Sequence, residues 1–594
     1  MAVTMSRQRK IVIFLIMGAI SLLGTGTGVL TYFLIRDSPS DESSDDESSG
    51  VYDKWAVATD TLKCSEIGNE TLKADGSAVD AAIAAMFCLG VVSMHSSGIG
   101  GGGVMLVYNQ TLKKATVIDF RETAPATADK NMFKGNESKS RKGGLSIAVP
   151  GEVRGMYEAW KQHGRLPWKR LVQPAIDLAK TGFKVTEAVD DALKTTKGIK
   201  KDIENDPGLS ELFLTDDKTL VEKGAKIKNV KYAKTLERVR DDPDSFYNGT
   251  LAGDILRDMK EVNGSVTEGD LRNYSSIIRE PYQSKLSNMK MYLTPPPTSG
   301  AVLALILNIM RGYNMTSSAR DDVNATVLKY HRIIESFKFS YAWRSLLGDP
   351  KRNPEIVENA KKMLDPKRGD DLRDRIRDSK TYKNVSYYAD SFSNADYGTT
   401  HVAVLALNGD AVSVTTTINM RFGAKYRSTR TGIIYNNQMA DFDIPGHEIV
   451  DDISPSPFNF PEPGKRPFSS MCPTIFTDND GKVRLVIGAS GGKMITTAVS
   501  LVLMNKLWFG YDLSEAVNKP RLHTQLVPDQ RVFYENEHNG TYRIQDDVIE
   551  GLRERGHNIT GSESFAVVQA IYNEPGVRIF AKSDPRKHGA PAGE

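Results

Sequence analysis

A glycine-threonine pair stands directly before two segments of alternating apolar residues. The pair is Gly398-Thr399, in the run 397–401. Residues 401–407 and 411–419 predict two strands, and the Asn-Gly dipeptide between them is the strongest short signal for a β-hairpin. The sequence therefore predicts that Thr399 stands at the head of a strand in an antiparallel sheet.

A hydroxyl residue placed directly after glycine at the head of a strand suggests a nucleophile made by self-cleavage. The Thr399 hydroxyl can attack the carbonyl of Gly398, because glycine tolerates the strained backbone that the attack needs. Cleavage frees the α-amine of Thr399, whose unperturbed pKa is about 7.7–8.0. This amine can then act as the base for its own hydroxyl. On these residues alone, the alternative is an ordinary hairpin with threonines on its face.

A series of short motifs, all in one order, resembles the γ-glutamyltransferases, also called glutathione hydrolases. These are N-terminal-nucleophile enzymes, and the resemblance covers roughly residues 53 to 590. The motifs are residues 76–82, 98–102, 121–125, 149–152, 295–300, 398–401, 415–419, 422–423, 432–442 and 467–474. The number of spaced motifs makes a chance match improbable.

The resemblance implies an α+β fold, a four-layer αββα sandwich of two stacked antiparallel sheets between helical layers. The pattern agrees, since a charged, helical middle (184–394) is followed by strands from Thr399 and a helix from Lys493 to about Phe509, without regular βαβ spacing. Self-cleavage would give a large subunit (53–398) and a small subunit (399–594) that form one fold as a heterodimer.

Three further elements are predicted from local patterns. A buried helix follows Ser77, which caps it, and another buried helix from residue 301 is capped by Ser299. Apolar periodicity predicts a helix over 330–347. Residues 98–103 fit the G-x-G-x-x-G dinucleotide pattern, but a helix precedes them and a strand follows, which is the reverse of a dinucleotide site.

For the reaction itself, the resemblance implies Thr399 as the nucleophile and Thr417 as the residue that orients its hydroxyl. The backbone amides of Gly491 and Gly492 would form the oxyanion hole. Residues 483–487 predict a strand, 488–492 a turn and 493 onward a helix, so both amides lie at a helix N-terminus, where the dipole favours negative charge.

Two neighbours of these residues need separate interpretation. His401 lies on the same sheet face as Thr399. It is interpreted as structural, since the free amine already supplies the base. Lys493 stands where the family usually has threonine.

A γ-glutamyl substrate carries a free α-amine and α-carboxylate at its far end. The resemblance implies that Arg121 binds the carboxylate, with Ser469 and Ser470 as further donors. It also places Asn419, Gln438 and Asp441 around the α-amine.

Gln438 departs from the glutamate of mammalian members. A neutral hydrogen bond contributes about 0.5–1.5 kcal/mol, against about 1.5–3 for a charged one. We therefore expect the grip on the amine to be looser by about a factor of ten. No cofactor and no metal is implied, and the nine histidines form no metal-spaced cluster.

Two other function classes stay open from the sequence. Residues 488–492 also spell G-x-S-x-G in a strand-turn-helix context, so Ser490 could be the nucleophile of an α/β-hydrolase with His523, His538 or His557 as its base. The chain could also be a non-catalytic cell-surface ectodomain.

The N-terminal segment predicts a membrane anchor. Residues 11–35 carry no charge over 25 positions, enough for a helix that crosses a bilayer. Arg7, Arg9 and Lys10 precede them, so residues 1–10 are predicted to stay cytoplasmic and the rest to lie outside. Residues 36–52 read as an acidic, serine-rich stalk. The prediction is a single-pass type II protein of the plasma membrane with an extracellular catalytic domain; the alternative is a cleaved signal peptide.

Glycosylation signals and cysteines fit an extracellular location. Cys64 and Cys88 could form one disulfide, a pairing that the resemblance favours, and Cys472 is interpreted as a buried small hydrophobe. The net charge of +3 without a basic block argues against nucleic-acid binding. The eleven sequons are Asn69, Asn109, Asn136, Asn248, Asn263, Asn273, Asn314, Asn324, Asn384, Asn539 and Asn558.

Together these features predict a self-cleaving membrane ectoenzyme. It would take γ-glutamyl groups from glutathione or its conjugates and transfer them to water, amino acids or dipeptide acceptors.

Overall fold

The computed structural model describes residues 47–313, 315, 322–388, 398–446, 454–527, 529–536 and 542–594. Residues 47–594 form one compact unit. Within the described ranges, no helix has the length and apolar character needed to cross a bilayer. The predicted cytoplasmic tail, the anchor and most of the stalk lie outside the described residues. The end of the predicted stalk differs, because Ser49–Tyr52 form an edge strand, β1, that pairs with β18.

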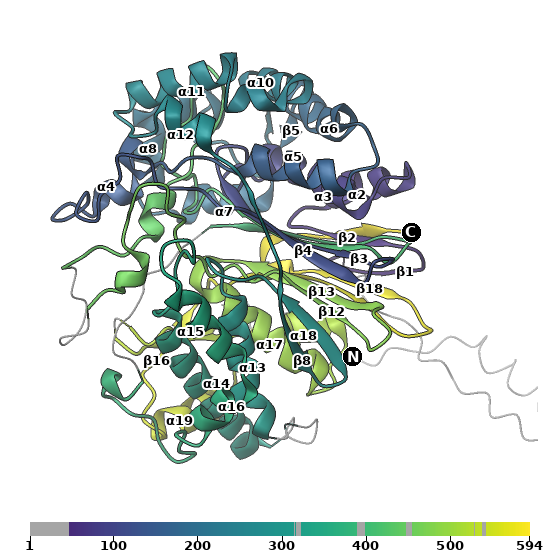
Figure 1. Cartoon of the computed structure of the whole chain (residues 1–594), viewed down its shortest axis with the longest axis vertical. Helices are drawn as coiled ribbons and strands as arrows, with labels where there is room; N and C mark the ends of the chain where they lie inside the picture. Colours follow the sequence, from purple (N-terminus) through teal and green to yellow (C-terminus); the bar gives the residue numbers. More distant parts are fainter. Residues whose placement is uncertain are drawn as a thin grey trace, which may run out of the picture. The chain divides into compact units, whose positions relative to one another are not determined.

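Two seven-stranded sheets form the centre of this unit, and every neighbouring pair of strands in them is antiparallel (Figure 1). The first sheet has the order β1, β18 (Ile579–Ser583), β17 (Val567–Asn573), β13 (Val483–Ser490), β12 (Thr474–Thr477), β9 (Met289–Leu293) and β8 (Tyr282–Leu286). The second has the order β19 (Pro591–Gly593), β2 (Ala56–Ala58), β10 (Thr400–Leu405), β11 (Ala411–Thr417), β3 (Gly102–Asn109), β4 (Lys114–Phe120) and β7 (Ile277–Arg279). The sheets pack face to face through β10 and β11 against β13.

Helices cover the outer face of each sheet (Figure 1). On the second sheet these are α2 (Leu62–Lys73), α3 (Ala78–Val92), α5 (Glu152–His163), α6 (Trp168–Thr181) and α10 (Val230–Asp241). On the first sheet they are α13 (Gly300–Met310), α14 (Val323–Arg344), α17 (Ile495–Leu507) and α18 (Leu513–Asn518). The predicted arrangement of two stacked antiparallel sheets with helices is therefore confirmed for the described residues.

Shorter elements complete the unit. The remaining helices are α4 (Ser138–Arg141), α7 (Glu187–Thr195), α8 (Ile199–Asn205), α9 (Pro207–Phe213), α11 (Thr250–Glu261), α12 (Glu268–Asn273), α15 (Glu355–Leu364), α16 (Pro366–Arg373) and α19 (Asp546–Glu554). Two small sheets contain β5 (Phe183–Lys184) with β6 (Lys226–Ile227), and β14 (Leu522–His523) with β15 (Val532–Glu535) and β16 (Ile559–Ser562).

The two faces of β10 enter different apolar cores, because side chains alternate along a strand. Val402 and Val404 pack in the core beneath α3 and α6. Ala403 and Leu405 pack in the core between the two sheets. Residues of odd number at the head of this strand, including Thr399, therefore face the opposite sheet.

The hairpin differs from its prediction at both ends. β10 ends at Leu405, and the turn is longer than two residues, since the Ala406 amide donates to the Asp410 carbonyl at 2.9 Å. Leu407, predicted within the strand, is 68% exposed. The return strand ends at Thr417 because Asn419 has a positive φ of 70°, which leaves extended geometry.

The structure shows the contacts of the two predicted helix caps and of the three cysteines. Ser77 forms the predicted cap of α3, within a capping box with Asp80. Ser299 holds the N-cap position of α13, as predicted, but its side chain makes no cap bond and instead donates to the Ser469 carbonyl at 2.8 Å. A disulfide joins Cys64 and Cys88, linking α2 to α3. Cys472 is buried, and burial raises its pKa to about 12, which suits an inert thiol.

The predicted helix over 330–347 is α14, which begins seven residues earlier and ends at Arg344. The glycine run 98–103 lies between α3 and β3, as the pattern indicated. The predicted helical middle of the chain also contributes strands β5 to β9.

Candidate active site

The residues around the proposed cleavage bond converge on the carbonyl oxygen of Gly398. The Thr417 hydroxyl donates to this oxygen at 2.6 Å, and the Thr399 hydroxyl lies 2.5 Å from the same atom. The two hydroxyl oxygens are 3.4 Å apart. Thr399 and Thr417 are buried, with exposed fractions of 4% and 3%. The hairpin thus brings together two hydroxyls that are eighteen residues apart in the sequence.

Gly398 occupies a backbone position that a larger residue would strain. Its φ is +101°, in the region that favours glycine. A Cβ atom there would lie 2.4 Å from the carbonyl oxygen of Asn419. Steric hindrance therefore disfavours any residue larger than glycine directly before Thr399 in this fold.

His401 is enclosed between the two sheets. Its Nδ1 lies 2.8 Å from the Thr415 hydroxyl, and a Cβ on Gly488 of the opposite sheet would meet the ring at 2.1 Å. Burial lowers the pKa of His401 to about 3, so the imidazole is neutral at physiological pH. These contacts support the structural interpretation of this histidine.

The proposed oxyanion residues follow β13 on the same side as Thr399. The Ser413 hydroxyl donates to the Ile487 carbonyl at 3.0 Å, while Gly488 faces His401. Ser413 pairs with Ala403 across the hairpin, so Ile487 lies opposite Ala403 and Gly488 lies opposite His401. The next residues of β13 therefore run toward Thr399.

The end of β13 differs from the predicted boundaries. The strand continues to Ser490, three residues past its predicted end. Gly491 has a φ of +124°, and a 3-10 turn (Gly492–Met494) precedes α17, which begins at Ile495. The Gly491 and Gly492 amides therefore lie at the start of a helical segment, as predicted.

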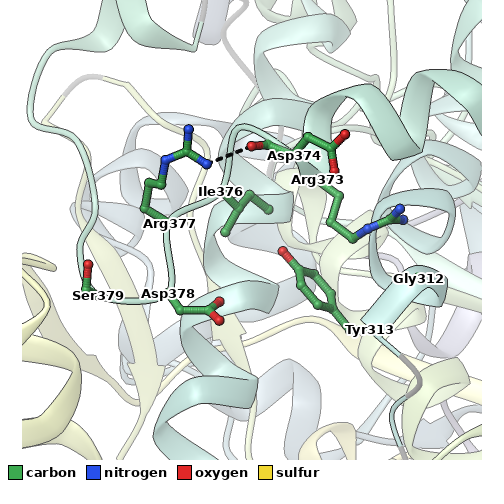
Figure 2. Close-up of a pocket in the computed structure, with 8 residues that line it drawn as sticks. All are labelled: Gly312, Tyr313, Arg373, Asp374, Ile376, Arg377, Asp378 and Ser379. Carbon is green, nitrogen blue, oxygen red and sulfur yellow. Dashed lines mark hydrogen bonds between the residues drawn. The ribbon is translucent and has the colours of Figure 1, made fainter.

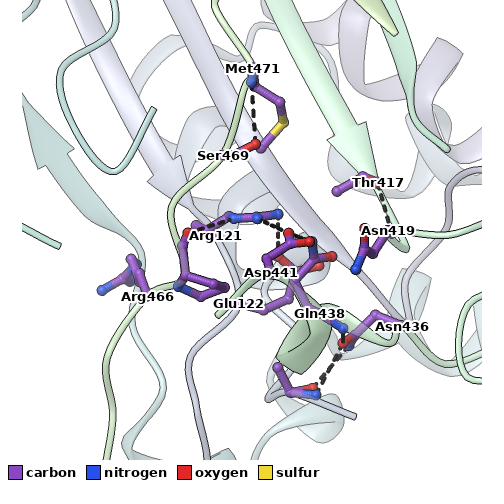
Figure 3. Close-up of polar contacts among 12 residues, drawn as sticks. Arg121, Glu122, Thr417, Asn419, Asn436, Gln438, Asp441, Arg466, Ser469 and Met471 are labelled. Atoms are coloured by element: carbon purple, nitrogen blue, oxygen red, sulfur yellow. Dashed lines mark hydrogen bonds and ion pairs between the residues drawn. The ribbon is translucent and has the colours of Figure 1, made fainter. Parts of the chain in front are cut away.

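A buried ion pair forms the centre of the predicted substrate clamp (Figure 3). Arg121 follows β4 and is fully buried; its guanidinium contacts the Asp441 carboxylate, and the Glu122 carboxylate lies 3.4 Å away. The Arg121 Nε also donates to the Pro467 carbonyl at 3.2 Å. The Gln438 amide nitrogen donates to the same Asp441 oxygen. The proposed anion-binding and amine-binding groups therefore meet in one site.

Two buried acceptors in this site have no hydrogen-bond partner among the described residues. They are Asn419 Oδ1 and Gln438 Oε1. The Asn419 backbone amide donates to the Thr417 hydroxyl at 2.8 Å, so the site adjoins Thr417 (Figure 3). Buried acceptors without partners are rare in folded proteins, and they indicate a missing donor. An ammonium group, with three donors, would satisfy both.

Comparison with known proteins agrees with this geometry. The family model described as Gamma-glutamyltranspeptidase matches residues 64–594. The chain is 39% identical to "Scoloptoxin SSD14" of Scolopendra dehaani over 596 residues, 99% of each chain. It is 40% identical to "Glutathione hydrolase 2" of Arabidopsis thaliana over 554 residues, 91% of this chain and 93% of that one. The chain belongs to the γ-glutamyltranspeptidase family.

Solved structures add a comparison of the fold. Cephalosporin acylase from Bacillus halodurans superposes with a TM-score of 0.77 at 23% identity, covering 95% of this chain and 99% of that one, which shows a shared fold alone. The γ-glutamyltranspeptidase of Helicobacter pylori gives a TM-score of 0.51 at 28% identity, covering 55% of this chain and 92% of that one. Membership of the γ-glutamyltranspeptidase family confirms the resemblance and the enzyme class predicted from the sequence.

The two serines of the predicted clamp have different surroundings in this γ-glutamyltranspeptidase fold. The Ser469 hydroxyl accepts from the Met471 amide at 3.2 Å (Figure 3). The Ser470 hydroxyl accepts from Arg344 Nη2 at 3.2 Å. Because a guanidinium only donates, the Ser470 proton is left to point elsewhere. Sequence reasoning missed Arg344, a buried residue of α14 that a helical pattern cannot distinguish from a surface arginine.

A second missed residue is Glu152, at the start of α5. Its side chain is 1% exposed, and it accepts from the Thr416 hydroxyl at 2.5 Å. Burial, and then the nearby charge of Glu122, raise the pKa of Glu152 well above its usual value, although the Thr416 hydrogen bond opposes this. The raised pKa favours the protonated form of this carboxyl, which lies on the hairpin face opposite to Thr417.

This burial predicts an unusual dependence of stability on pH. An unfolded chain ionises Glu152 above about pH 4.3, whereas the folded protein keeps the proton, so this group lowers stability as pH rises. We expect Glu152→Gln to match the wild type near pH 4 and to melt at a higher temperature than the wild type at pH 7.5. The measurement is the melting midpoint of both proteins across this range. Glu152→Ala, which also leaves a cavity, should melt lower at every pH; a constant difference for Glu152→Gln would contradict the assignment.

The serine-hydrolase alternative finds no support in the described residues. Ser490 is the last residue of β13 and pairs with Val567 in an antiparallel ladder. His523 lies 3.0 Å from the Thr497 hydroxyl, and His557 contacts His331 at 2.8 Å. Neither histidine hydrogen-bonds to Ser490 in the part of the chain that the structure describes. His538 lies outside the described residues.

A cavity of about 560 Å³ lies elsewhere, beside the end of α16 (Figure 2). Its lining includes Tyr313, Arg373 and Arg377. Arg373 pairs with Asp370 at 2.8 Å, and Arg377 donates to the Asp374 carbonyl at 2.9 Å. None of the predicted site residues is among the residues that line it.

Proposed function

We propose that this chain is a precursor that cleaves itself between Gly398 and Thr399 and then works as a γ-glutamyltransferase and glutathione hydrolase. Its products would be the large subunit, ending at Gly398, and the small subunit, beginning with the nucleophile. The two would stay together as a heterodimer, because each sheet contains strands from both subunits.

The cleavage step follows from the contacts of Gly398. The Thr399 oxygen adds to the Gly398 carbonyl carbon, and Thr417 donates to the carbonyl oxygen as negative charge develops there. The C–N bond breaks, the threonine proton moves to the departing nitrogen, and an ester remains. Water then hydrolyses the ester, which frees the Gly398 carboxylate and the α-amine and hydroxyl of Thr399.

In turnover, the free α-amine takes the proton of the Thr399 hydroxyl, which attacks the γ-carbonyl of the substrate. The Gly491 and Gly492 amides stabilise the oxyanion, and removal of one such donor typically costs about 2.7–4 kcal/mol. The leaving amine departs with a proton, and a γ-glutamyl ester on Thr399 remains. Water, an amino acid or a dipeptide then takes the acyl group.

The observation that carries the substrate class is the buried clamp beside Thr417. It offers a guanidinium for an α-carboxylate, contributed by Arg121, and a carboxylate for an α-amine, contributed by Asp441. The unpartnered oxygens of Asn419 and Gln438 add two acceptors for the same amine. A γ-glutamyl group carries both charges at the end remote from its amide, as in glutathione and its conjugates.

We also propose that residues 11–35 anchor the protein in the plasma membrane as a type II protein with its catalytic part outside. This rests on the uncharged segment, the preceding basic residues, the sequons and the disulfide. Among the sequons that the structure describes, Asn69 is an exception, since it is buried and accepts from Trp55 Nε1 at 2.8 Å. The folded protein therefore offers no access for a glycan at Asn69.

A pair of anilide substrates tests the proposed substrate class. We expect purified protein to release aniline from a γ-glutamyl anilide, and to lose about 10–150-fold in kcat/KM on the glutaryl anilide, which lacks the α-amine. The range corresponds to a charged hydrogen bond of about 1.5–3 kcal/mol. Equal rates on the two substrates would contradict a site built for the amine.

A further inference from the structure

The C-terminal segment of the chain contacts the nucleophile residue. Lys587, at the end of a 3-10 turn (Pro585–Lys587), donates from Nζ to the carbonyl oxygen of Thr399 at 2.8 Å. The same ammonium contacts the Asp60 carboxylate at 2.5 Å. The Lys587 side chain is 11% exposed and that of Asp60 is fully buried. A largely buried cation therefore lies on the residue that carries the proposed nucleophile.

Asp60 is held in place independently of Lys587. Its Oδ1 accepts from the Gln569 amide at 2.7 Å, and its Oδ2 accepts from the Thr400 hydroxyl. Thr400 is the neighbour of Thr399, and its side chain lies on the opposite face of β10. The carboxylate and the ammonium thus contact each other and bond to two consecutive residues, Thr400 and Thr399, at the head of the strand.

A buried network fixes the segment that carries Lys587. Asp584 contacts Arg521 at 2.6 Å and accepts from the Val568 amide at 2.8 Å. Arg586 contacts Glu535 at 2.5 Å and Asp584 at 3.1 Å. Since these partners lie in or beside β15 and β17, the position of the ammonium is set by the fold and not by a mobile tail.

Other charged groups near this end of the hairpin have their own partners. Arg421 follows β11 and donates to the Thr195 hydroxyl at 2.6 Å. Burial lowers the pKa of Arg421, and the nearby Asp191 carboxylate of α7 opposes this shift. His588 lies 3.3 Å from Glu187 and 3.7 Å from Asp191.

The pKa of His95, which follows α3, is affected by the positive charges at this end of the hairpin. Burial lowers its pKa well below the usual value, and the charges of Lys587 and Arg421 add to the effect. In the part of the chain that the structure describes, Lys587 is the cation with a hydrogen bond to Thr399.

We propose that Lys587 is a positioning residue of the processed enzyme: its ammonium holds the new N-terminal residue and disfavours protonation of the Thr399 α-amine, while Asp60 limits this effect. The inference rests on the proposed function, since the amine exists only after cleavage. A like charge close to an amine disfavours the charged form, so the amine stays available as a base at lower pH.

The test is the acid limb of kcat/KM against pH, which reports the ionisation of the free enzyme. A γ-glutamyl anilide without added acceptor is the substrate. We expect Lys587→Met to move this limb up by about one pH unit or more, because the cation is lost and Asp60 remains. Asp60→Asn should move it down. The double variant should fall between the two, near the wild type.

Matched controls separate charge from shape. Lys587→Arg keeps the cation and should leave the limb within a few tenths of a pH unit of the wild type. His588→Gln changes the next residue, whose contacts are with α7, and should leave it in place. A purely structural role for Lys587 would lower kcat/KM at every pH without moving the limb, and that result would overturn the proposal.

Maturation of the variants is followed by denaturing electrophoresis. If Lys587→Met does not mature, Asp60→Asn decides: a downward shift supports the proposal and an unmoved limb overturns it. If the wild type itself releases no aniline, the proposed function fails, and this inference fails with it. A wild type that is active, with an unmoved limb in both variants, refutes only the role of Lys587.

Discussion

Thr399→Ala is expected to leave the protein as one uncleaved chain without γ-glutamyl activity. The variant removes the oxygen that lies 2.5 Å from the Gly398 carbonyl oxygen, while Thr417 and the strand remain. Without that oxygen neither the ester nor the free amine can form, so activity should fall by about 10⁴-fold or more. The measurement is denaturing electrophoresis with N-terminal sequencing of the bands.

The wild type and two neighbours provide the controls. The wild type should give a small fragment of about 196 residues that begins with Thr399. Thr399→Ser keeps the hydroxyl and should still cleave. Thr400→Ala alters the adjacent threonine, which contacts Asp60 on the other face of β10, and should also cleave. A mature, active wild type that is a single polypeptide would refute the mechanism.

Asp441→Asn is expected to lower kcat/KM for a γ-glutamyl anilide by about 10–150-fold, chiefly through KM. The change removes the charge that would pair with the substrate amine, a charged hydrogen bond of about 1.5–3 kcal/mol. Self-cleavage should persist, because Asp441 is bonded to Arg121 and Gln438 and not to Gly398. Steady-state kinetics on the γ-glutamyl and glutaryl anilides measures the effect.

The glutaryl anilide supplies the internal control for Asp441. It has no α-amine, so Asp441→Asn should change its kcat/KM much less, and the difference isolates the amine contact. Glu122→Gln is the matched variant, since Glu122 also contacts Arg121, at 3.4 Å. We expect Glu122→Gln to have less than a tenfold effect. Equal losses on both anilides for Asp441→Asn would place Asp441 in a structural role only.

Much of the local structure was predictable because its signals lie within a few residues. The alternation in 401–407 and 411–419 predicted the hairpin, and Ser77 with Asp80 formed the expected cap. The ends of elements were less predictable. β10 stops at Leu405 because the turn closes between Ala406 and Asp410, a contact that depends on backbone geometry and not on side-chain type.

The motifs of the family gave the candidate site residues, but not their contacts. Arg121 and Asp441 are 320 positions apart, and nothing in either local sequence shows that they form a buried pair. Arg344 and Lys587 were missed for the same reason. Each is an ordinary basic residue in its own segment, and only its position beside Ser470 or Thr399 gives it significance.

The sequence by itself determined the hairpin, the family and the types of residue available for the chemistry, because strand alternation, turn residues and ordered motifs are read along the chain. The tertiary structure alone decided which charges are buried together, that His401 stays neutral between the sheets, and that a C-terminal lysine contacts Thr399. Desolvation and ion pairing depend on distances through space, and stacking two sheets sets those distances between residues hundreds of positions apart.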